Sequence, residues 1–524
     1  MKKYFPLFWV FYLLCAFSAH AGEGRYTIPL TGGGWSLWLD KEAGWQNDRL
    51  YLPHEITDLS LLPVNVPTGG WQTLSHNPDA VPVEVPGTVE EYLTVTDNPR
   101  PENFRGVSWW YRKITIPADQ QKKRFIIYFE SVRMRAEVYL DGKLVAYDLI
   151  GETPFHVDIT DEAKPGKEQL LAIRVTNPGG NFHWQEFDIM KWGEYNIPPS
   201  RSFTGIIGRV KLESVNPVFI SDIYMQNTPE LTKVNAILSF TNETSSSVKQ
   251  DVELIVNEKG NPDKVVFRQT LKAISFPAGN HEVTIPVNVP DAKLWDLSTP
   301  ELYTCNVLIK KGKKMLDQDK KDFGFRWFTV DGVGKDAVLR LNGRRIMLRS
   351  AISWGYFPVT GLIATTEMAE KQVRTAKSLG LNMLNFHRCI GSPVVLEKAD
   401  ELGLLYYEEP GSFHSANHDP FIRTIVNEKL KRMVYRDRSH PSLVIFNLIN
   451  EFGGPLSQDK ALVAKRMNDM REAHAIDPSR IMSFTSGWAG SEDKEEDSKA
   501  HMLPFDTTLY RKGWYDNHRA GGPE

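Results

Sequence analysis

Cysteine is scarce in this sequence and net charge is almost absent, and each absence excludes a class of protein. The 524 residues include 3 cysteines, and 62 Lys and Arg nearly balance 65 Asp and Glu, which leaves a net charge of −3. A nucleic-acid partner normally requires a basic excess, so none is expected. Cys305 and Cys389 lie far apart, and no Cys/His cluster has the spacing of a zinc site. Both residues are predicted to be buried free thiols.

Long apolar runs are missing as well, apart from one at the N-terminus. Two lysines at positions 2 and 3 precede the run Phe5–Phe17, and Ala19-His20-Ala21 follows it. A basic start, a short apolar run and an A-x-A site are typical of a secretory signal peptide. Residues 1–21 are therefore predicted to be removed, so that the mature chain is secreted or periplasmic and has no membrane span. A membrane anchor is the alternative, although the run is short for crossing a bilayer.

The composition, 41% hydrophobic and 24% charged, is that of a globular protein, and the length is sufficient for several domains. Residues 22–215 contain short β-branched and aromatic runs, such as Arg124–Phe129 and Ala136–Leu140. Asp141-Gly142, which follows the second run, is typical of a hairpin turn. This segment is predicted to be a β-sandwich or a jelly roll.

Residues 216–330 continue in the same style. Apolar and polar residues alternate over Val234–Phe240 and Asp251–Val256. A β-rich segment of about 110 residues suits an immunoglobulin-like sandwich.

The pattern changes in residues 331–524, where short apolar strands alternate with helical stretches. Helices are predicted where the periodicity is helical, over 365–379, 393–402, 421–435 and 459–474. Strands are predicted between them, over 381–385, 404–407, 442–449 and 480–484. This order predicts a parallel sheet, most simply a (β/α)₈ TIM barrel.

In such a barrel the chemistry lies at the carboxyl ends of the strands. The residues that end or follow the predicted strands are polar, ionisable or aromatic: Asn385, His387, Arg388, Glu408, Glu409, Asn450, Glu451, Ser486 and Trp488. Glycosidases require two carboxylates that flank an oxocarbenium-like transition state, together with donors for the sugar hydroxyls. These strand ends therefore indicate a candidate glycosidase site.

Glu451 follows the most apolar strand, and it has two interpretations. Partial desolvation would raise its pKa and keep it protonated, as a general acid requires. Alternatively, Asn450 and Glu451 open a helix, since Asn is a good N-cap and Glu suits a first turn. The residue pattern alone does not decide between them.

The segment His440–Glu451, preceded by two arginines at the predicted helix end, resembles the signature of glycoside hydrolase family 2, in which His-Pro-Ser leads into a strand that ends in Asn-Glu. Other segments are similar to parts of the same family: Trp110–Pro117 and Thr153–Thr160 to its jelly roll, Phe323–Arg326 to the exit of its sandwich, and Met347–Arg349 to its first barrel strand. The resemblance implies a jelly roll, an immunoglobulin-like sandwich and a barrel, in that order. It also implies retaining hydrolysis of a terminal β-linked sugar by an exo-acting enzyme such as a β-galactosidase, β-glucuronidase or β-mannosidase.

The resemblance implies roles for individual residues. Glu451 matches the catalytic acid/base of the family, and Asn450 matches a ligand of the sugar 2-hydroxyl. His387 or Arg388 stands near a barrel histidine that contacts the sugar. The substrate is therefore expected to be a carbohydrate, and its identity is not predicted.

Three further candidates have alternatives. Glu409 either orders the site, or binds a divalent cation together with Glu451, or is a buried carboxylate paired with an arginine; no metal and no cofactor are predicted. Trp488 either stacks on a sugar or closes the top of the barrel. Asp516 and His518 either follow a sixth strand and contact the sugar, or lie in a surface loop.

One expected part of the site is missing from the sequence. Strands counted from residue 347 number about six, whereas a closed barrel has eight. In the family the nucleophilic Glu ends the seventh strand, and no residue here matches it, although a retaining enzyme needs this carboxylate about 5–5.5 Å from the first. The chain, which stops at Glu524, is therefore predicted to be a fragment or a C-terminally truncated form. A non-catalytic carbohydrate-binding protein is the alternative, and the oligomeric state is not predicted.

Overall fold

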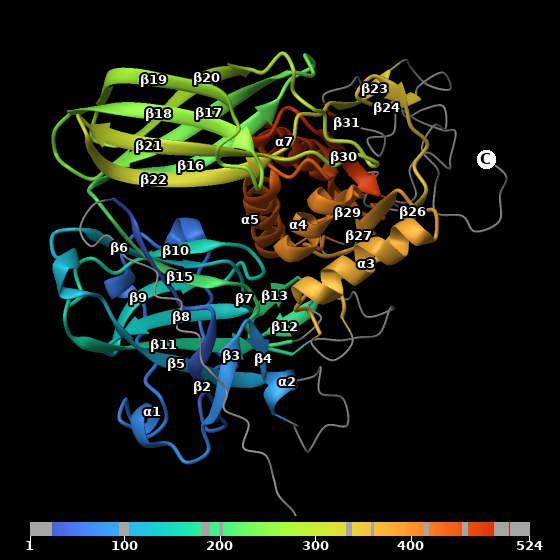
Figure 1. The fold of residues 1–524 in the computed structure, drawn as a ribbon. Helices are drawn as coiled ribbons and strands as arrows, with labels where there is room; N and C mark the ends of the chain where they lie inside the picture. Colours follow the sequence, from blue (N-terminus) through green and yellow to red (C-terminus); the bar gives the residue numbers. More distant parts are fainter. Residues whose placement is uncertain are drawn as a thin grey trace, which may run out of the picture.

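The computed structural model of this chain describes residues 24–93, 104–179, 189–198, 203–331, 338–357, 361–412, 419–452, 459–486 and 502–503. Within these ranges the chain forms two β-sandwiches followed by an α/β unit (Figure 1). The predicted order of jelly roll, immunoglobulin-like sandwich and barrel sheet is confirmed by this order of elements. None of the helices in the described part is long and apolar enough to cross a membrane.

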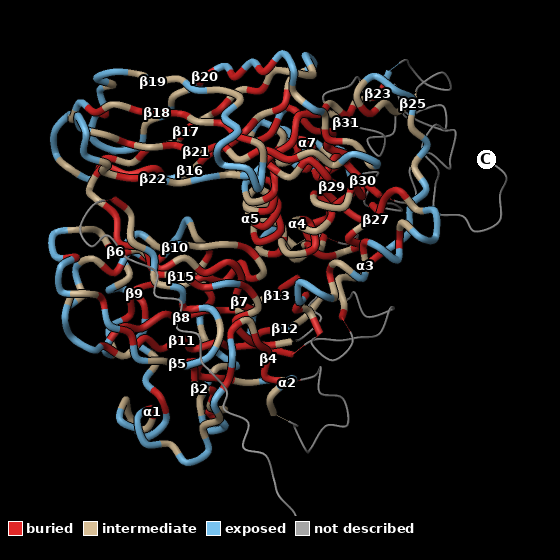
Figure 2. Tube along the Cα trace, in the orientation of Figure 1, coloured by how far each residue is buried: buried red, intermediate tan, exposed pale blue. Residues whose placement is uncertain are grey.

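The first sandwich packs a large sheet against a smaller one. Buried and partly exposed side chains alternate along Arg124–Phe129 in the smaller sheet, which turns its buried residues to the shared core (Figure 2). The larger sheet has the order β3 (Val81–Val85), β2 (Gly32–Asp40), β5 (Gly106–Thr115), β11 (Glu168–Asn177), β8 (Arg135–Leu140) and β9 (Lys143–Asp148). The smaller sheet has the order β1 (Tyr26–Pro29), β15 (Val210–Val215), β6 (Arg124–Phe129) and β10 (Phe155–Asp158). Short elements complete this unit: α1 (Thr73–His76), α2 (Val89–Tyr92), β4 (Gly87–Thr88), β7 (Val132–Arg133), β12 (Met190–Trp192), β13 (Tyr195–Ile197) and β14 (Gly205–Ile206).

The predicted hairpin turn at Asp141-Gly142 is confirmed. It connects the paired strands β8 and β9. Both turn residues have positive φ angles, 49° and 83°, which is the backbone geometry of a type I′ turn.

The second sandwich consists of seven strands in two sheets. One sheet has the order β16 (Val218–Asn227), β17 (Lys233–Asn242) and β20 (Gly279–Asn288). The other has the order β19 (Val265–Phe276), β18 (Val248–Glu258), β21 (Tyr303–Lys311) and β22 (Lys314–Phe323). Burial alternates strictly along β17, as its sequence pattern predicts. Cys305 is buried in this core and Cys389 in the α/β unit, and neither of these two described cysteines forms a disulfide, as predicted.

The α/β unit follows a small sheet of β23 (Phe328–Asp331), β24 (Val338–Leu341) and β25 (Arg344–Arg345). Its main sheet has the order β26 (Ser350–Ser353), β27 (Met383–Phe386), β28 (Leu405–Glu408), β29 (Leu443–Asn450), β30 (Ile481–Ser486) and β31 (Met502–Leu503). The pairs from β26 to β30 are parallel, and β31 is antiparallel to β30. The helices are α3 (Thr366–Ser378), α4 (Pro393–Leu402), α5 (Pro420–Asp437) and α7 (Lys460–Ile476). In the described ranges this sheet is open, with β26 and β31 at its edges.

The first barrel strand was expected at Met347–Arg349, and this expectation is wrong. The strand is β26, which begins at Ser350. The preceding backbone is held by Asn382, whose side chain donates to the carbonyl of Met347 at 2.8 Å and accepts from the N–H of Arg349 at 2.7 Å. The strand therefore ends at Ser353 and not at Arg349, and the first residue after the strand is Trp354.

Charged side chains join the second sandwich to the strand that carries the candidate acid/base. Arg326 is buried and donates to the carbonyl of Pro441 at 3.0 Å and to that of Leu443 at 2.8 Å, at the start of β29. The start of β29 is therefore fixed by a residue from outside the barrel sheet.

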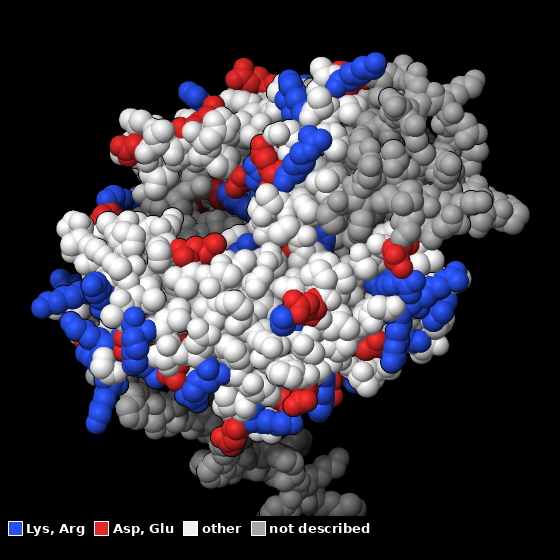
Figure 3. All heavy atoms as spheres, turned by 90° about the horizontal axis from the view of Figure 1, so that it is seen from above, with Lys and Arg blue, Asp and Glu red and all other residues white. Residues whose placement is uncertain are grey.

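A cavity of about 840 Å³ lies where the two sandwiches meet the α/β unit. Seen from above, the surface of the molecule is hollowed, with charged side chains of both signs at the hollow (Figure 3).

Candidate active site

Four neighbouring parallel strands, β27 to β30, bring their carboxyl ends together. The predicted site residues in the described ranges lie at these ends: His387, Arg388, Glu409, Asn450 and Glu451. Trp488, Asp516 and His518 lie outside the described residues.

Glu451 directly follows β29 and is buried. Its N–H donates to the carbonyl of Ser486 at 2.7 Å. Its φ angle is 51°, so Glu451 does not lie in the first turn of an α-helix, where φ is negative. Arg388 also has a positive φ, 56°. Positive φ is uncommon for residues other than glycine, and such strain clusters at functional sites.

Arg388 connects the residues of three strand ends. Its Nη2 lies 3.1 Å from Oε1 of Glu451, and its Nε donates to Oδ1 of Asn450 at 2.5 Å. Its main-chain N–H donates to Oε2 of Glu409 at 2.8 Å. The structure therefore brings four of the predicted residues of the site, Arg388, Glu409, Asn450 and Glu451, into contact through one arginine.

Glu409 is fully buried, and both of its carboxyl oxygens have donors. Oε1 accepts from the hydroxyl of Ser486 at 2.6 Å, and Oε2 accepts from the N–H of Arg388. Burial raises the pKa of Glu409, and these hydrogen bonds offset only part of the increase. Glu409 is thus a buried carboxylate, and its hydrogen bond with Arg388 is made by the main chain and not by the guanidinium.

His387 is buried beside an aromatic residue that the sequence analysis missed. Its ring lies 4.7 Å from the ring of Trp354 in an edge-to-face arrangement, and its main-chain N–H donates to the carbonyl of Ser353. The guanidinium of Arg388 lies 5.7 Å from the Trp354 ring. Trp354 directly follows β26. Correct placement of the first barrel strand would have identified it as a strand-end residue.

Ser486, at the end of β30, joins the same network. Besides donating to Glu409, its hydroxyl accepts from Nδ2 of Asn450 at 2.9 Å and from Nδ2 of Asn447 at 3.2 Å. The sequence marked Ser486 only as a strand end, and its position there is the signal that would have assigned it to the site. In the described part of the chain, no group of three or more His, Cys, Asp or Glu side chains could hold a metal ion.

Comparison with known families covers the three units in order. Residues 35–196 match the family described as "Glycosyl hydrolases family 2, sugar binding domain", residues 218–326 match "Glycosyl hydrolases family 2", and residues 335–517 match "Glycosyl hydrolases family 2, TIM barrel domain".

Related proteins and structures agree with this assignment. A putative beta-glucuronidase of Formosa agariphila is 26% identical over 509 residues, which are 94% of this chain and 56% of that protein. A beta-galactosidase of Thermoanaerobacterium thermosulfurigenes is 30% identical over 377 residues, 70% of this chain and 49% of that protein. A crystal structure of a glycosyl hydrolase family 2 member from Bacteroides cellulosilyticus is 18% identical, with a TM-score of 0.71 over 89% of this chain and 56% of that one. The chain thus spans about half the length of these proteins. With all three of its units matched, the chain belongs to glycoside hydrolase family 2.

Proposed function

We propose that this chain carries the acid/base side of the active site of a retaining exo-β-glycosidase, with Glu451 as the catalytic acid/base. The observation that carries the proposal is the contact of Arg388 with both Glu451 and Asn450 at the ends of β27 and β29. Catalytic residues of (β/α)₈ barrels lie at this end of the sheet. The membership of the chain in glycoside hydrolase family 2 supports the reaction class.

In this role Glu451 gives a proton to the glycosidic oxygen while the bond from that oxygen to the anomeric carbon breaks and the second carboxylate of the mechanism bonds to that carbon. It later takes a proton from the water that releases the sugar. Arg388 holds the carboxyl group of Glu451 in place, and a preorganised acid lowers the cost of reaching the transition state. Asn450, oriented by Arg388 and Ser486, is the proposed ligand of the sugar 2-hydroxyl.

The second carboxylate of the mechanism is not Glu409. Both of its oxygens are occupied by donors from the protein, and the side chain is fully buried, so it is unsuited to attack an anomeric carbon. The proposal assigns no nucleophile among the described residues. The reaction is proposed to need no cofactor, because two carboxylates are sufficient for it.

The proposed substrate is a terminal β-linked sugar of an oligo- or polysaccharide. The names of the relatives, beta-glucuronidase and beta-galactosidase, support this class. Export to the periplasm or the medium is part of the proposal, supported by the pattern of residues 1–21. Amino-terminal sequencing of the exported protein is expected to begin at Gly22, and a protein that retains Met1 would contradict export with cleavage.

The test is hydrolysis of a panel of nitrophenyl and dinitrophenyl β-glycosides, including a glucuronide, a galactoside and a mannoside, measured on the full-length gene product that contains this chain, because a retaining reaction also requires a nucleophile. Glu451→Gln is expected to abolish turnover of the substrates with poor leaving groups. It is expected to spare the first step with dinitrophenyl glycosides, whose leaving group needs no proton. The control is Glu397→Gln on α4, which removes an exposed carboxylate outside the site. Saturable sugar binding without turnover would favour the carbohydrate-binding alternative, and absence of both would contradict the proposal.

A further inference from the structure

The loop that carries His387 and Arg388 is held at its far end by two side chains. The N–H of Gly391 donates to Oε1 of Glu408 at 2.7 Å. The carbonyl of Gly391 accepts from Nη2 of Arg436 at 2.8 Å. Both hydrogen-bonding groups of Gly391 are therefore fixed by residues from outside the loop, one at the end of β28 and one on α5.

Gly391 also packs against Phe386 without room for a side chain. A Cβ atom at position 391 would lie 2.1 Å from the ring of Phe386, which is far inside contact distance. Phe386 is the last residue of β27 and is fully buried. The loop thus leaves the strand at Phe386 and returns onto the same ring at Gly391, with His387 and Arg388 between these two points.

Arg436 is itself held firmly. Its Nε donates to both carboxyl oxygens of Asp437, at 2.8 and 2.9 Å, and its Nη2 donates to Oδ2 at 2.7 Å. The same Nη2 lies 3.3 Å from Oε1 of Glu408. The side chains of Asp437 and Glu408 are completely buried, and that of Arg436 is nearly so. The guanidinium therefore has a single defined position from which it reaches Gly391.

The buried group contains one guanidinium and two carboxyl groups. Burial lowers the pKa of Arg436, but Asp437 and Glu408 raise it by more, so the guanidinium stays charged. Burial raises the pKa of Glu408, and the neighbouring Asp437 raises it further. Arg436 lowers the pKa of Glu408 in turn, but not by enough to offset burial and Asp437.

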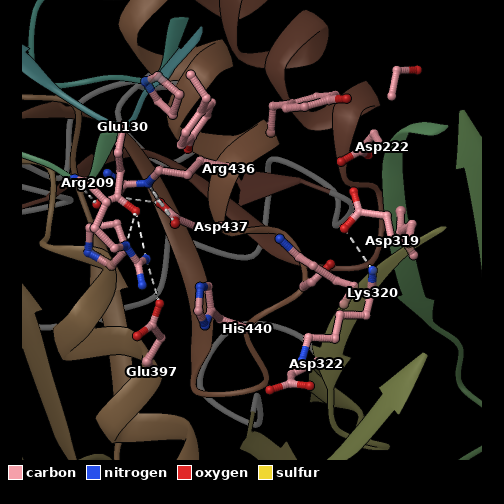
Figure 4. A pocket seen from close by; sticks show the side chains of 18 of the residues that line it. Glu130, Arg209, Asp222, Asp319, Lys320, Asp322, Glu397, Arg436, Asp437 and His440 are labelled. Carbon is pink, nitrogen blue, oxygen red and sulfur yellow. Dashed lines mark hydrogen bonds and ion pairs between the residues drawn. The ribbon is translucent and has the colours of Figure 1, made fainter. Parts of the chain in front are cut away.

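The group lies at the wall of the cavity between the three units. Arg436 and Asp437 lie side by side there, near the ion pairs of Arg209 with Glu130 and Glu397 (Figure 4). Glu130, from the first sandwich, contributes to the raised pKa of Arg436. The residues that fix the loop at Gly391 therefore include Arg436 and Asp437, which lie at the junction of the three units and not in the candidate site.

We propose that Arg436, fixed by Asp437, is a positioning residue that works with Glu408 to fix Gly391 and thereby the loop that carries His387 and Arg388. Its catalytic consequence rests on the proposed glycosidase function, because Arg388 contacts Glu451 and Asn450. Arg388 keeps a positive φ that non-glycine residues rarely adopt, and such a conformation persists only where the surroundings impose it. Anchoring the loop at Gly391 supplies one of these constraints.

The first test reads the loop without using activity. Trp354 lies against His387 and Arg388, so a 5-fluorotryptophan label at this position reports by ¹⁹F NMR on the loop, with Trp354→Phe assigning the signal. Arg436→Lys is expected to shift or broaden this signal, because lysine cannot bind Asp437 through two nitrogens and still reach Gly391. Asp437→Asn, which keeps the guanidinium, is the second variant if Arg436→Lys does not fold.

The matched control is Arg432→Gln. Arg432 lies about one turn earlier on α5, lines the same cavity and pairs with Asp148 and Glu428, which are not part of the loop. Its Trp354 signal is expected to match that of the unsubstituted protein. An unchanged signal in both the Arg436→Lys and Asp437→Asn variants, or an equal change in the control, would overturn the proposal.

The second test is kinetic. Arg436→Lys is expected to lower kcat/KM by about tenfold to a hundredfold for poor leaving groups, because a displaced loop misplaces the partner of the acid. The loss is expected to be smaller for dinitrophenyl glycosides. If the unsubstituted protein shows no turnover, the proposed function fails and the ¹⁹F result alone decides on positioning. If turnover is present and the Trp354 signal does not change in the Arg436→Lys and Asp437→Asn variants, the proposed positioning role of Arg436 is wrong and the proposed glycosidase function is retained.

Discussion

The guanidinium of Arg388 lies 3.1 Å from Oε1 of Glu451, in an ion pair that is nearly closed to solvent on both sides. The side chains of Arg388 and Glu451 are 9% and 10% exposed. Because removing one partner of a buried pair leaves the other charge uncompensated, the pair is sensitive to substitution of either residue.

Arg388→Gln is therefore expected to lower the free energy of unfolding by about 3 kcal/mol, the lower end of the range for breaking a buried pair. Urea denaturation followed by circular dichroism measures the change. The control is Arg374→Gln on α3, whose 2.7 Å pair with Glu370 is 62% and 39% exposed. Exposed pairs one helical turn apart contribute only about 0.3–0.5 kcal/mol. Equal losses in the two variants would contradict the buried character of the Arg388 pair.

The strand ends of the site could be predicted because their signals are local. All eight residues of β29 are buried, so the apolar run that ends in Asn450 is visible in the sequence. The helix α4 begins with Pro393 and ends before Gly403, which has a φ of 74°, so both of its ends were predicted correctly.

Contacts between distant segments had no such signal. Trp354 was missed because the family resemblance placed the first barrel strand at Met347–Arg349, whereas β26 covers Ser350–Ser353 and ends directly before Trp354. The contact of Arg436 with Gly391 depends on how α5 packs over the sheet, and periodicity along one helix does not encode it. Sequence patterns thus located the carboxyl ends of the strands but not the side chains that support them.

A second prediction concerns pH. The pKa of Glu408 is raised above 4.5, by burial first and by Asp437 second. Below pH 4.5 Glu408 is protonated in both folded and unfolded chains, so Glu408→Gln is expected to change stability little there. As the pH rises, the unfolded chain ionises first, and the unsubstituted protein is expected to lose stability relative to Glu408→Gln. Unfolding free energies measured from pH 4 to pH 8 test this, and a difference that is constant with pH would contradict it.

Glu401→Gln provides a control of opposite sign. Burial raises the pKa of Glu401, but hydrogen bonds from Lys398 and Lys259 lower it by more, so the net shift is downward from 4.5. Its stabilising effect is therefore present above pH 4.5 and is lost as the pH falls through the folded-state pKa. The stability difference between Glu401→Gln and the unsubstituted protein is expected to shrink on acidification.

A third prediction concerns the junction of the second sandwich with the α/β unit. The hydroxyl of Tyr224 on β16 donates to Oδ1 of Asp477 at 2.5 Å, and Asp477 is a completely buried carboxylate. Hydrogen bonds to charged groups contribute about 1.5–3 kcal/mol, so Tyr224→Phe is expected to lower the free energy of unfolding by that amount. Tyr303→Phe is the control, because the Tyr303 hydroxyl only accepts from the N–H of Lys293, at 2.8 Å. A neutral bond of this kind contributes about 0.5–1.5 kcal/mol, and a larger loss in Tyr303→Phe would contradict the assignment.

The last prediction tests Ser486 as a link between Glu409 and Asn450. Ser486→Ala removes the donor to Glu409 and the acceptor for Asn450, so the pKa of Glu409 is expected to rise further and the amide of Asn450 to lose its orientation. The value of kcat/KM is expected to fall by roughly tenfold or more, since the proposed ligand of the sugar 2-hydroxyl is then misplaced.

Ser483→Ala is the matched control on the same strand: Ser483 is also buried, and its hydroxyl donates to the carbonyl of Thr485 at 2.9 Å. Both substitutions are expected to lower the free energy of unfolding by about 1–3 kcal/mol, because each leaves a buried group without its partner. Only Ser486→Ala is expected to change the kinetics, and a similar fall in kcat/KM for Ser483→Ala would show that the effect comes from the strand as a whole and not from the Ser486 hydroxyl.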